Sequence, residues 1–484
     1  MTEKMSLFEQ LYSYGEMDYY PYHMPGHKRR QLGEIPEQLL KADITEIDGF
    51  DNLHQPEGLL QKLQERANAL YRAEETFYLI NGSTGGILTA ISSVLPRGGH
   101  LLMARDCHKS AYHAAYLRGL RVSYLYAERV KGFDFNEAVT AEQVERSLAE
   151  QPDVGAVLIV SPTYEGRIAD IQEIARVVHS RGIPLLVDEA HGAHLGFAEG
   201  FAPGSCTQGA DIVVHSVHKT LPAMTQTALL HLNGNLVDRE RVRRFLHIYQ
   251  SSSPSYLLMA GICDAMEIVE RKGQERFAWF RQRYECMLKR LEACDTFRFV
   301  PWQDVEQGRQ DIGKLVIDTG PSRVSGQQLY RMLLEQYHLQ CEMAAGHYCL
   351  AMFTMADETE AYDRMERALL ELDGRLAEPR CGTSEEERES SRRTAAVLSK
   401  PEIAYSMAEA WDMSWKMTRL SDAVGHPVAD FINLYPPGIP LLLPGEVLTE
   451  SLYQQIMDSL TKELTLQGIK ESDGEYFIKM IKVG

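Results

Sequence analysis

Short apolar runs alternate with helix-like segments over residues 60–250, and this alternation limits the choice of fold more than any other feature of the chain. Parallel strands that helices cover on both faces read as unbroken runs of Val, Ile and Leu. One helix-like segment spans 171–181 and is followed by Gly182, a typical helix stop. The pattern predicts a doubly wound α/β domain with a mostly parallel sheet. The predicted strands are His100–Ala104, Ala156–Val160, Pro184–Val187, Ile212–Val214 and Thr227–Leu232.

The rest of the 484-residue chain divides by its composition. A long helical stretch at 257–293, followed by strand candidates at Lys314–Asp318 and Tyr348–Thr354, predicts a smaller α+β domain. A polar, charged run at 378–393 has no aromatic residue and predicts a linker. In chain order we expect an N-terminal arm (1–55), a large domain (56–255), a small α+β domain (256–377), a linker (378–395) and a C-terminal domain (396–484).

Charge and cysteine usage exclude several classes of function. Lys and Arg total 50 against 68 Asp and Glu, so the net charge of −18 argues against a nucleic-acid partner. The chain has no apolar stretch long enough to span a membrane, and its N-terminus lacks the apolar core of a secretion signal. The eight cysteines form no CxxC motif, which predicts no metal site and reduced thiols in a cytoplasmic protein.

The segment Asn81–Gly86 has the composition of an anion-binding turn. It follows the apolar run Phe77–Ile80 and opens the helical run Ile87–Leu95. Glycines let the backbone approach a ligand, hydroxyls donate hydrogen bonds, and the helix N-terminus adds its dipole. Taken alone, the segment is explained equally well as a plain turn with a helix cap.

Asp188 stands at the carboxyl end of a predicted buried strand, where open α/β sheets bind ligands. A carboxylate there holds a metal, a ribose or a protonated nitrogen, or only caps the strand end. The letters of Leu185–His191 also occur in the second nucleotide-binding strand of DEAH-type helicases. That interpretation fails, because the only near match to a phosphate loop, Gly308–Lys314, comes after this strand and lacks the final hydroxyl.

Lys219 follows the next predicted strand, after Ser216 and His218. A lysine in a pocket attacks a carbonyl to form a Schiff base, whereas a lone lysine after a strand is usually a solvated surface residue. The order decides between the two, because the anion cup, Asp188 and Lys219 succeed one another along the chain. This order outlines a pyridoxal-phosphate (PLP) enzyme of the aspartate-aminotransferase fold, in which a lysine and a carboxylate hold the cofactor.

The sequence resembles the Orn/Lys/Arg decarboxylases among the PLP enzymes of fold type I. The resemblance is to the short form of Gram-positive bacteria, which lacks the N-terminal receiver-like domain. It implies a large PLP-binding domain and smaller α+β C-terminal domains. The matching segments follow the family's order over nearly the whole chain and are His23–Lys28, Asn81–Gly85, Asp106–Ser110, Ser161–Tyr164, Val187–Gly192, Ser216–Lys219, Ser252–Tyr256 and Tyr435–Pro440.

The resemblance assigns roles to individual residues. Lys219 carries the cofactor as a Schiff base, Asp188 pairs with its pyridine nitrogen, and His108 stacks on its ring. Lys219 or His218 returns a proton to the substrate's α-carbon. The other residues expected to bind the cofactor are Ser83, Thr84, Gly85, Ala190, His191, Ser216, His218 and, on the phosphate of the neighbouring subunit, Ser252.

The implied reaction is decarboxylation of a basic L-amino acid, with arginine expected first, lysine second and ornithine third. Glu446 is the candidate partner of the substrate's distal cation, although a surface glutamate that caps the next helix explains it as well. The implied assembly is a homodimer or a larger homo-oligomer with a shared active site. An aminotransferase or a lyase of the same fold is the alternative, whereas a non-catalytic scaffold would not need both Lys219 and Asp188.

Overall fold

A computed structural model describes residues 6–320, 324–376, 401–434, 439–461 and 465–482 of the chain. The predicted linker (378–395) and residues 435–438 of the Tyr435–Pro440 segment lie outside the described residues. The chain forms two compact units, of which the first comprises 1–96, 155–161 and 170–279. The second unit comprises 97–154, 162–169 and 280–484. The five-part domain division stays a prediction.

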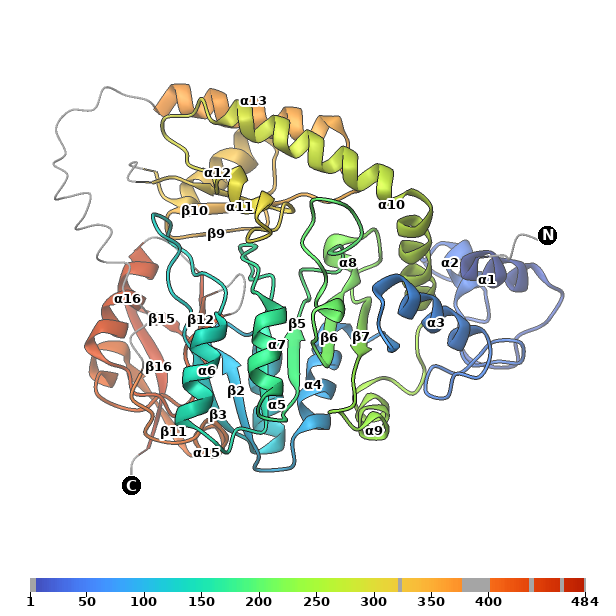
Figure 1. Ribbon diagram of the computed structural model, residues 1–484, viewed down its shortest axis with the longest axis horizontal. Helices are drawn as coiled ribbons and strands as arrows, with labels where there is room; N and C mark the ends of the chain where they lie inside the picture. Colours follow the sequence, from blue (N-terminus) through green and yellow to red (C-terminus); the bar gives the residue numbers. More distant parts are fainter. Residues whose placement is uncertain (1–5, 321–323, 377–400, 435–438, 462–464, 483–484) are drawn as a thin grey trace. The chain divides into compact units, whose positions relative to one another are not determined.

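A seven-stranded sheet contains all the strands predicted in the first half of the chain (Figure 1). Its order is β1-β7-β6-β5-β4-β2-β3. The pairs β4–β5, β5–β6 and β2–β3 are parallel, and β7 is antiparallel to both β1 and β6, so the predicted mostly parallel sheet is confirmed. The bounds are β1 (Glu75–Leu79), β2 (His100–Ala104), β3 (Arg121–Leu125), β4 (Ala156–Val160), β5 (Leu185–Asp188), β6 (Ile212–Ser216) and β7 (Ala228–Leu232).

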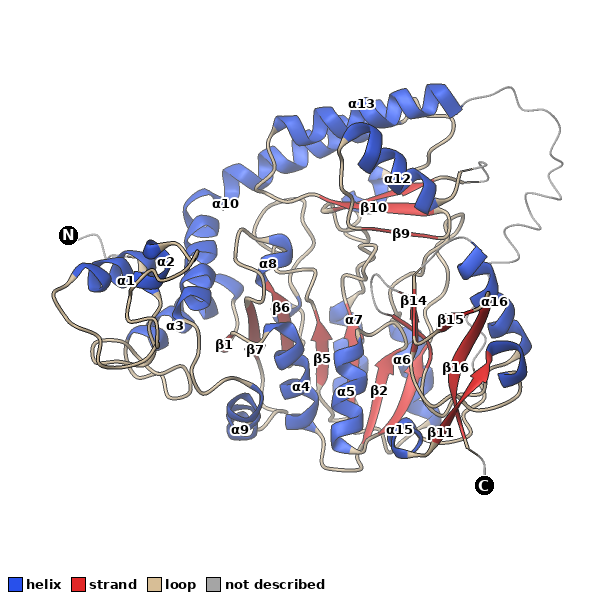
Figure 2. Cartoon of the chain, turned by 180° about the vertical axis from the view of Figure 1, so that it is seen from behind, coloured by secondary structure: helices blue, strands red, loops and turns tan. Residues whose placement is uncertain are grey.

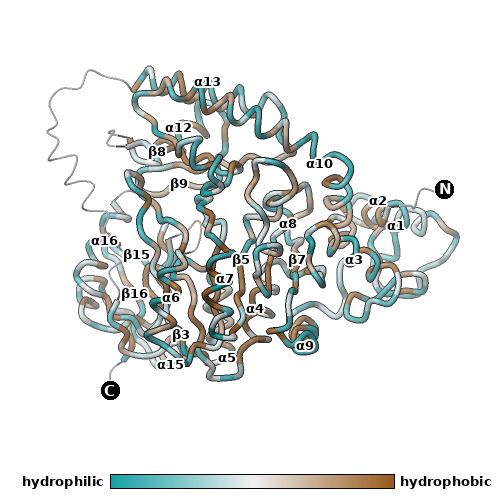
Figure 3. The backbone as a smooth tube through the Cα atoms, viewed as in Figure 1, coloured by the Kyte–Doolittle hydropathy of each residue, from teal (hydrophilic) through white to brown (hydrophobic). Residues whose placement is uncertain are grey.

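Helices of the first unit cover strands β1, β5, β6 and β7. Helix α4 packs on β5 and β6, beside which it is seen from behind in Figure 2, and α3 packs on β1. The apolar colour of the strands in Figure 3 is explained by this cover, because covered strands need no polar face. The helices are α1 (Leu7–Glu16), α2 (Glu37–Ala42), α3 (Leu59–Tyr71), α4 (Gly82–Val94), α7 (Ile171–His179), η1 (Ser205–Thr207), α8 (Val217–Thr220), α9 (Arg239–Tyr249) and α10 (Tyr256–Leu291), which continues into the second unit.

Gly86 sets how closely α4 approaches the sheet. A Cβ atom at this position would lie 2.7 Å from Leu79 Cδ1 of β1 and 2.7 Å from Val214 Cγ1 of β6. Real Cβ atoms do not approach other atoms so closely, so only glycine fits here without a shift of the helix or the strands. The first turn of α4 is therefore seated directly on β1 and β6.

The second unit contains three further small sheets, with strand orders β8-β10-β9, β11-β16-β15 and β13-β12-β14. Their strands are β8 (Lys314–Asp318), β9 (Met343–Ala345), β10 (Tyr348–Met352), β11 (Trp415–Arg419), β12 (Ile432–Leu434), β13 (Ile439–Leu442), β14 (Leu466–Gln467), β15 (Lys470–Ser472) and β16 (Glu475–Ile481). The helices are α5 (Lys109–Arg118), α6 (Ala141–Glu150), α11 (Trp302–Glu306), α12 (Gly326–Tyr337), α13 (Thr359–Leu376), α15 (Met407–Asp412), η2 (Leu420–Ala423) and α16 (Glu450–Thr461).

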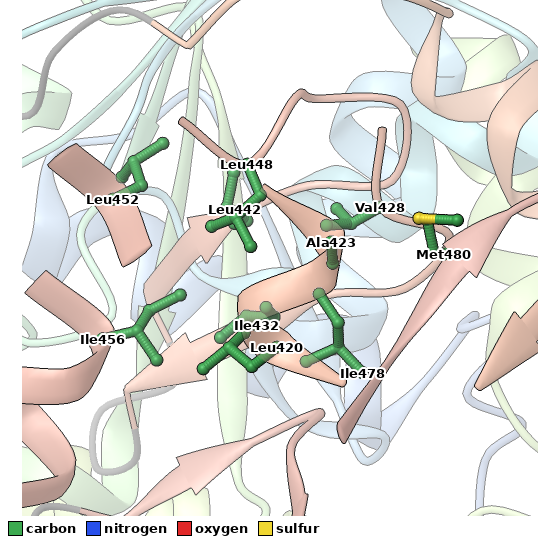
Figure 4. Packing of buried hydrophobic residues seen from close by; sticks show 10 residues of the cluster. All are labelled: Leu420, Ala423, Val428, Ile432, Leu442, Leu448, Leu452, Ile456, Ile478 and Met480. Atoms are coloured by element: carbon green, nitrogen blue, oxygen red, sulfur yellow. The ribbon is translucent and has the colours of Figure 1, made fainter. Parts of the chain in front are cut away.

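The described residues after position 400 include a buried apolar cluster of their own. Leu420 of η2, Leu442 of β13 and Ile456 of α16 contribute to this cluster of buried apolar side chains (Figure 4). The cluster explains how short strands and a single long helix hold together. None of the helices in the described parts of the chain combines the length and the apolar character that a membrane span requires.

Candidate active site

The carboxyl ends of β1, β5 and β6 meet at one edge of the sheet within the first unit. Leu79 at the end of β1 and Ser216 at the end of β6 both pair with Ala228, the first residue of β7. Asp188 ends β5 and pairs with Val214 of β6. This edge therefore collects the start of α4, the end of β5 and the short helix α8 (Figure 1). It is where open α/β sheets bind their ligands.

The start of α4 has the form of an anion cup. Gly82 begins the helix with φ +68°, and the N-cap residue Asn81 makes no side-chain cap. The Asn81 side chain donates instead to the Tyr249 carbonyl oxygen at 2.9 Å, which leaves the first amides of the helix without a side-chain acceptor. Ser216 Oγ donates to Ser83 Oγ at 2.8 Å, so two hydroxyls stand at this helix start. Uncapped amides, a helix dipole and hydroxyls together suit a phosphate group.

Thr84 and Gly85 complete the first turn of α4. Thr84 is exposed and Gly85 is buried. A Cβ on Gly85 would lie 3.3 Å from the Asn81 Cβ, so the glycine keeps the turn compact. The structure thus brings the predicted cup residues together in one turn.

Asp188 is a buried carboxylate with 6% of its surface exposed. Its Oδ1 accepts a hydrogen bond from the Ala190 amide at 3.1 Å. Burial raises the pKa of Asp188 above its ordinary value, while the charge of Lys219 and the Ala190 amide act in the opposite direction. A carboxylate in this environment pairs strongly with a cationic nitrogen.

Lys219 lies in α8, and its Nζ is 3.1 Å from Nε2 of His191. His218, its neighbour, donates from Nδ1 to the Thr227 carbonyl oxygen at 2.9 Å. Burial lowers the pKa of His218, so its imidazole is neutral at physiological pH, with Nε2 as the acceptor nitrogen. The site thus holds an amine and two imidazoles in one unit.

These residues fit PLP by the chemistry of their donors and acceptors. The cup suits its phosphate, Asp188 its pyridine nitrogen and Lys219 its aldehyde. Ala190 is buried next to Asp188, and Ser252 is exposed in the segment between α9 and α10. The sequence had singled out every one of these positions.

Two predicted site residues, His108 and Glu446, belong to the second unit. His108 caps helix α5: its Nδ1 accepts from the Ser110 amide at 3.3 Å, and its side chain is exposed. Glu446 is only 2% exposed, so it is not the surface cap that was the other interpretation. Its Oε2 lies 3.1 Å from Arg105 Nη2, and burial raises its pKa although Arg105 acts in the opposite direction.

Arg105 is the residue of this pair that the sequence did not reveal. It is buried and also donates to the Pro440 carbonyl oxygen at 2.9 Å. The two charged residues are 341 positions apart, and no local pattern connects them. The sequence signal is that Arg105 directly precedes the matching segment Asp106–Ser110 and that Glu446 follows Tyr435–Pro440 by six positions.

A sheet of this topology with a lysine and a carboxylate at its carboxyl edge defines the fold-type I class of PLP enzymes. Lysine decarboxylase A from Pseudomonas aeruginosa has the same fold, with a TM-score of 0.82 at 21% sequence identity. That alignment covers 99% of this chain and 80% of the other.

The sequence description of the Orn/Lys/Arg decarboxylase major domain matches residues 5–348, and that of the C-terminal domain matches 389–482. The chain therefore belongs to the Orn/Lys/Arg decarboxylase family. An arginine decarboxylase of Halalkalibacterium halodurans is 29% identical over 99% of this chain and 98% of its own length. An arginine decarboxylase of Bacillus subtilis is 29% identical over 95% of this chain and 94% of its own.

Proposed function

We propose that this protein is a PLP-dependent decarboxylase of a basic L-amino acid, with arginine as the first substrate to test, then lysine and ornithine. The observation that carries the proposal is the meeting of Lys219, Asp188 and the Ser83 cup at one sheet edge. Full-length similarity to arginine decarboxylases supports the order of substrates.

The roles of the residues follow from their environments. PLP supplies an electron sink for the electron pair that remains when CO₂ departs. The α4 cup binds the phosphate, and Lys219 anchors the aldehyde carbon. Asp188 holds a proton on the pyridine nitrogen, because a buried carboxylate favours a cation beside it.

Two imidazoles handle protons near Lys219. The imidazole of His191 is within hydrogen-bond distance of the Lys219 amine and orients it. His218 has its Nδ1 proton committed to the Thr227 carbonyl oxygen, so Nε2 is left to exchange a proton at the substrate's α-carbon. His108 is assigned to stacking on the cofactor ring.

Glu446 is assigned to the distal cation of the substrate. Its Oε2 is used by Arg105 and by the Leu443 amide at 2.8 Å. Its Oε1 is buried and, among the described residues, has no hydrogen-bond partner. A buried acceptor without a donor favours an ammonium or guanidinium group.

We propose that the protein is cytoplasmic and forms a homodimer. In the loop between α1 and α2, Tyr22 is 90% exposed and Leu32 is 93% exposed. Monomeric proteins rarely expose several large apolar side chains in one segment. A second copy of the chain is the occupant, and Ser252 reaches the phosphate of that partner's site. Seven cysteines in the described residues are free thiols, which supports the proposed cytoplasmic location.

The decisive experiment incubates the purified protein and PLP with each of arginine, lysine and ornithine, and measures CO₂ and the amine product. We expect stoichiometric CO₂ and amine from at least one of them, and neither from Lys219→Ala, which also loses the absorbance of lysine-bound cofactor. Production of a keto acid without CO₂ would identify an aminotransferase and overturn the proposal.

A further inference from the structure

A buried chain of hydrogen bonds crosses the sheet of the first unit beside Asp188. Glu189 Oε2 lies 2.7 Å from His215 Nε2, and His215 Nδ1 lies 2.9 Å from His231 Nε2. The chain ends where His231 Nδ1 meets Thr76 Oγ1 at 2.8 Å. It therefore links the residue after β5 with β6, β7 and β1 through side chains alone.

This chain lies on the face of the sheet opposite to the anion cup. Successive residues of a strand point to opposite faces. Val214 and Ser216 point towards α4, because Val214 would touch a Cβ on Gly86 and Ser216 bonds to Ser83. His215, between them, points to the other face, where the ring of Tyr71 in α3 packs against it at a tilt, with a centroid distance of 4.8 Å.

Water has no access to the chain. Glu189 and His215 are each 1% exposed, and His231 is fully buried. The Tyr71 ring also lies 4.6 Å from His231, so one aromatic ring covers both imidazoles. The other carboxylate oxygen of Glu189 is occupied by Ser205 Oγ, which donates to Oε1 at 2.6 Å.

The hydrogen bonds allow His215 to carry a proton on both ring nitrogens, with Nε2 donating to Glu189 and Nδ1 donating to Nε2 of His231. An ionised Glu189 carboxylate only accepts, so His215 Nε2 carries a proton. Burial, and next the charge of His215, lower the pKa of His231 well below its ordinary value, so His231 is neutral. Within this series of hydrogen-bonded side chains, His215 is thus the residue that contacts the Glu189 carboxylate and can carry a compensating positive charge.

Neutralisation matters because Asp188 and Glu189 are adjacent in the chain and both buried. Burial raises the pKa of Asp188, and a positive charge on His215 acts in the opposite direction, so it favours the ionised form of Asp188. We propose that Glu189, His215 and His231 form a positioning relay that neutralises the second carboxylate and reserves Asp188 as the ionised group of the candidate active site. This inference rests on the proposed function, since Asp188 serves the cofactor there.

The test uses His215→Gln, Glu189→Gln and the double variant in the full chain. Glutamine keeps a donor and an acceptor at position 215 but cannot be charged. The matched control is His100→Gln: His100 Nδ1 lies 3.2 Å from Asp153, whose side chain is 53% exposed and is hydrated without help. Thermal unfolding of each variant first confirms that it folds.

The first readout is the infrared band of protonated carboxyl groups at about pH 8, well above the ordinary range of carboxyl titration. We expect His215→Gln to gain one such group over the parent chain, and the double variant and His100→Gln to gain none. An unchanged spectrum in His215→Gln overturns the relay. If that variant does not fold, a protonated carboxyl group already present in the parent chain and lost in Glu189→Gln overturns it equally.

The second readout is kcat/KM for decarboxylation, with the absorbance of bound PLP followed against pH. We expect His215→Gln to lose about tenfold, as a shift of about one pKa unit at Asp188 implies, and the double variant to regain most of that loss. A double variant that is worse than His215→Gln assigns these residues to packing alone and overturns the relay. Release of no CO₂ by any variant or by the parent refutes the proposed function, whereas the infrared result still decides the relay.

Discussion

The side-chain nitrogen of Lys219 lies 3.1 Å from Nε2 of His191, which follows Asp188 by three positions on the strand-to-loop junction of β5. The amine of Lys219 in helix α8 is thus held by an imidazole in the segment that follows β5. Asp188 and His191 belong to the same four-residue stretch of backbone, and His191 contacts the amine of Lys219. The backbone that positions the carboxylate therefore also positions the imidazole that orients the amine.

His191→Leu should slow the capture of PLP by Lys219 by about tenfold or more. The reason is the loss of the hydrogen bond that orients the amine, since a hydrogen bond worth about 1.5 kcal/mol corresponds to about tenfold. The rise of absorbance after mixing with PLP measures the rate. His191→Gln keeps an acceptor and should recover most of it, and equal rates in all three proteins would contradict the assignment.

Asp188→Asn should still bind PLP but decarboxylate at least about a hundredfold more slowly, because an amide cannot hold the ring nitrogen protonated. Single-turnover release of CO₂ separates this effect from binding. Turnover near that of the parent chain would refute the proposal that Asp188 keeps the ring nitrogen protonated.

Ser216→Ala should weaken PLP binding by about ten- to a hundredfold, as expected for one hydrogen bond to an anion. It removes the hydroxyl that bonds to Ser83 at the start of α4. Ser93→Ala is the matched control, since Ser93 Oγ donates to the Ala90 carbonyl oxygen inside the same helix. Equilibrium dialysis against PLP gives both dissociation constants, and equal losses would place the effect in the helix and not in the cup.

Arg105→Met should destabilise the protein by about 3–5 kcal/mol, because it leaves the buried Glu446 carboxylate without its cationic partner. Arg121→Met is the control: Arg121 pairs with Asp153, and both are more than half exposed, so a change below about 1 kcal/mol is expected. Urea unfolding measures both free energies. A small effect of Arg105→Met would show that Glu446 is solvated in the native protein.

Acid should destabilise the fold through the buried histidines. The pKa of His231 lies well below the ordinary value of 6.5 because of burial. Below about pH 6.5 the unfolded chain takes up a proton on His231, whereas the native protein does not, so the free energy of unfolding falls as the pH drops. Above about pH 6.5 His231 is neutral in both states, and the stability that its burial permits is fully present. Unfolding in urea at about pH 8 and about pH 5.5 measures the loss, and His231→Gln should reduce the slope.

The strands that the sequence predicts are those with uninterrupted apolar runs. β2, β4 and β8 have the predicted bounds, and β5 is displaced by one residue. The strand β3 was not predicted, because Arg121 is exposed, the next three residues are only half-buried and Leu125 alone is buried, so no apolar run marks it. Edge strands of this kind need knowledge of their neighbours.

The candidate site was predictable where function leaves a local pattern. The α4 cup, Asp188 and Lys219 each stand at a junction between a strand and a helix, and their order along the chain is informative. The relay was not predictable, since the predicted strand stopped at Val214 and His215 is the next residue of β6. Its meaning depends on His231, which comes near it only through the antiparallel pairing of β6 and β7.

Gly86 has a consequence for how the protein meets its cofactor. With no side chain between α4 and the two strands, this end of the helix has little lateral play. The packing at Gly86 holds the helix start that we propose to bind the phosphate, so we expect phosphate binding to need little ordering of the backbone. We then expect the affinity for the cofactor to depend on the contacts formed in the complex more than on the entropy lost in ordering the backbone.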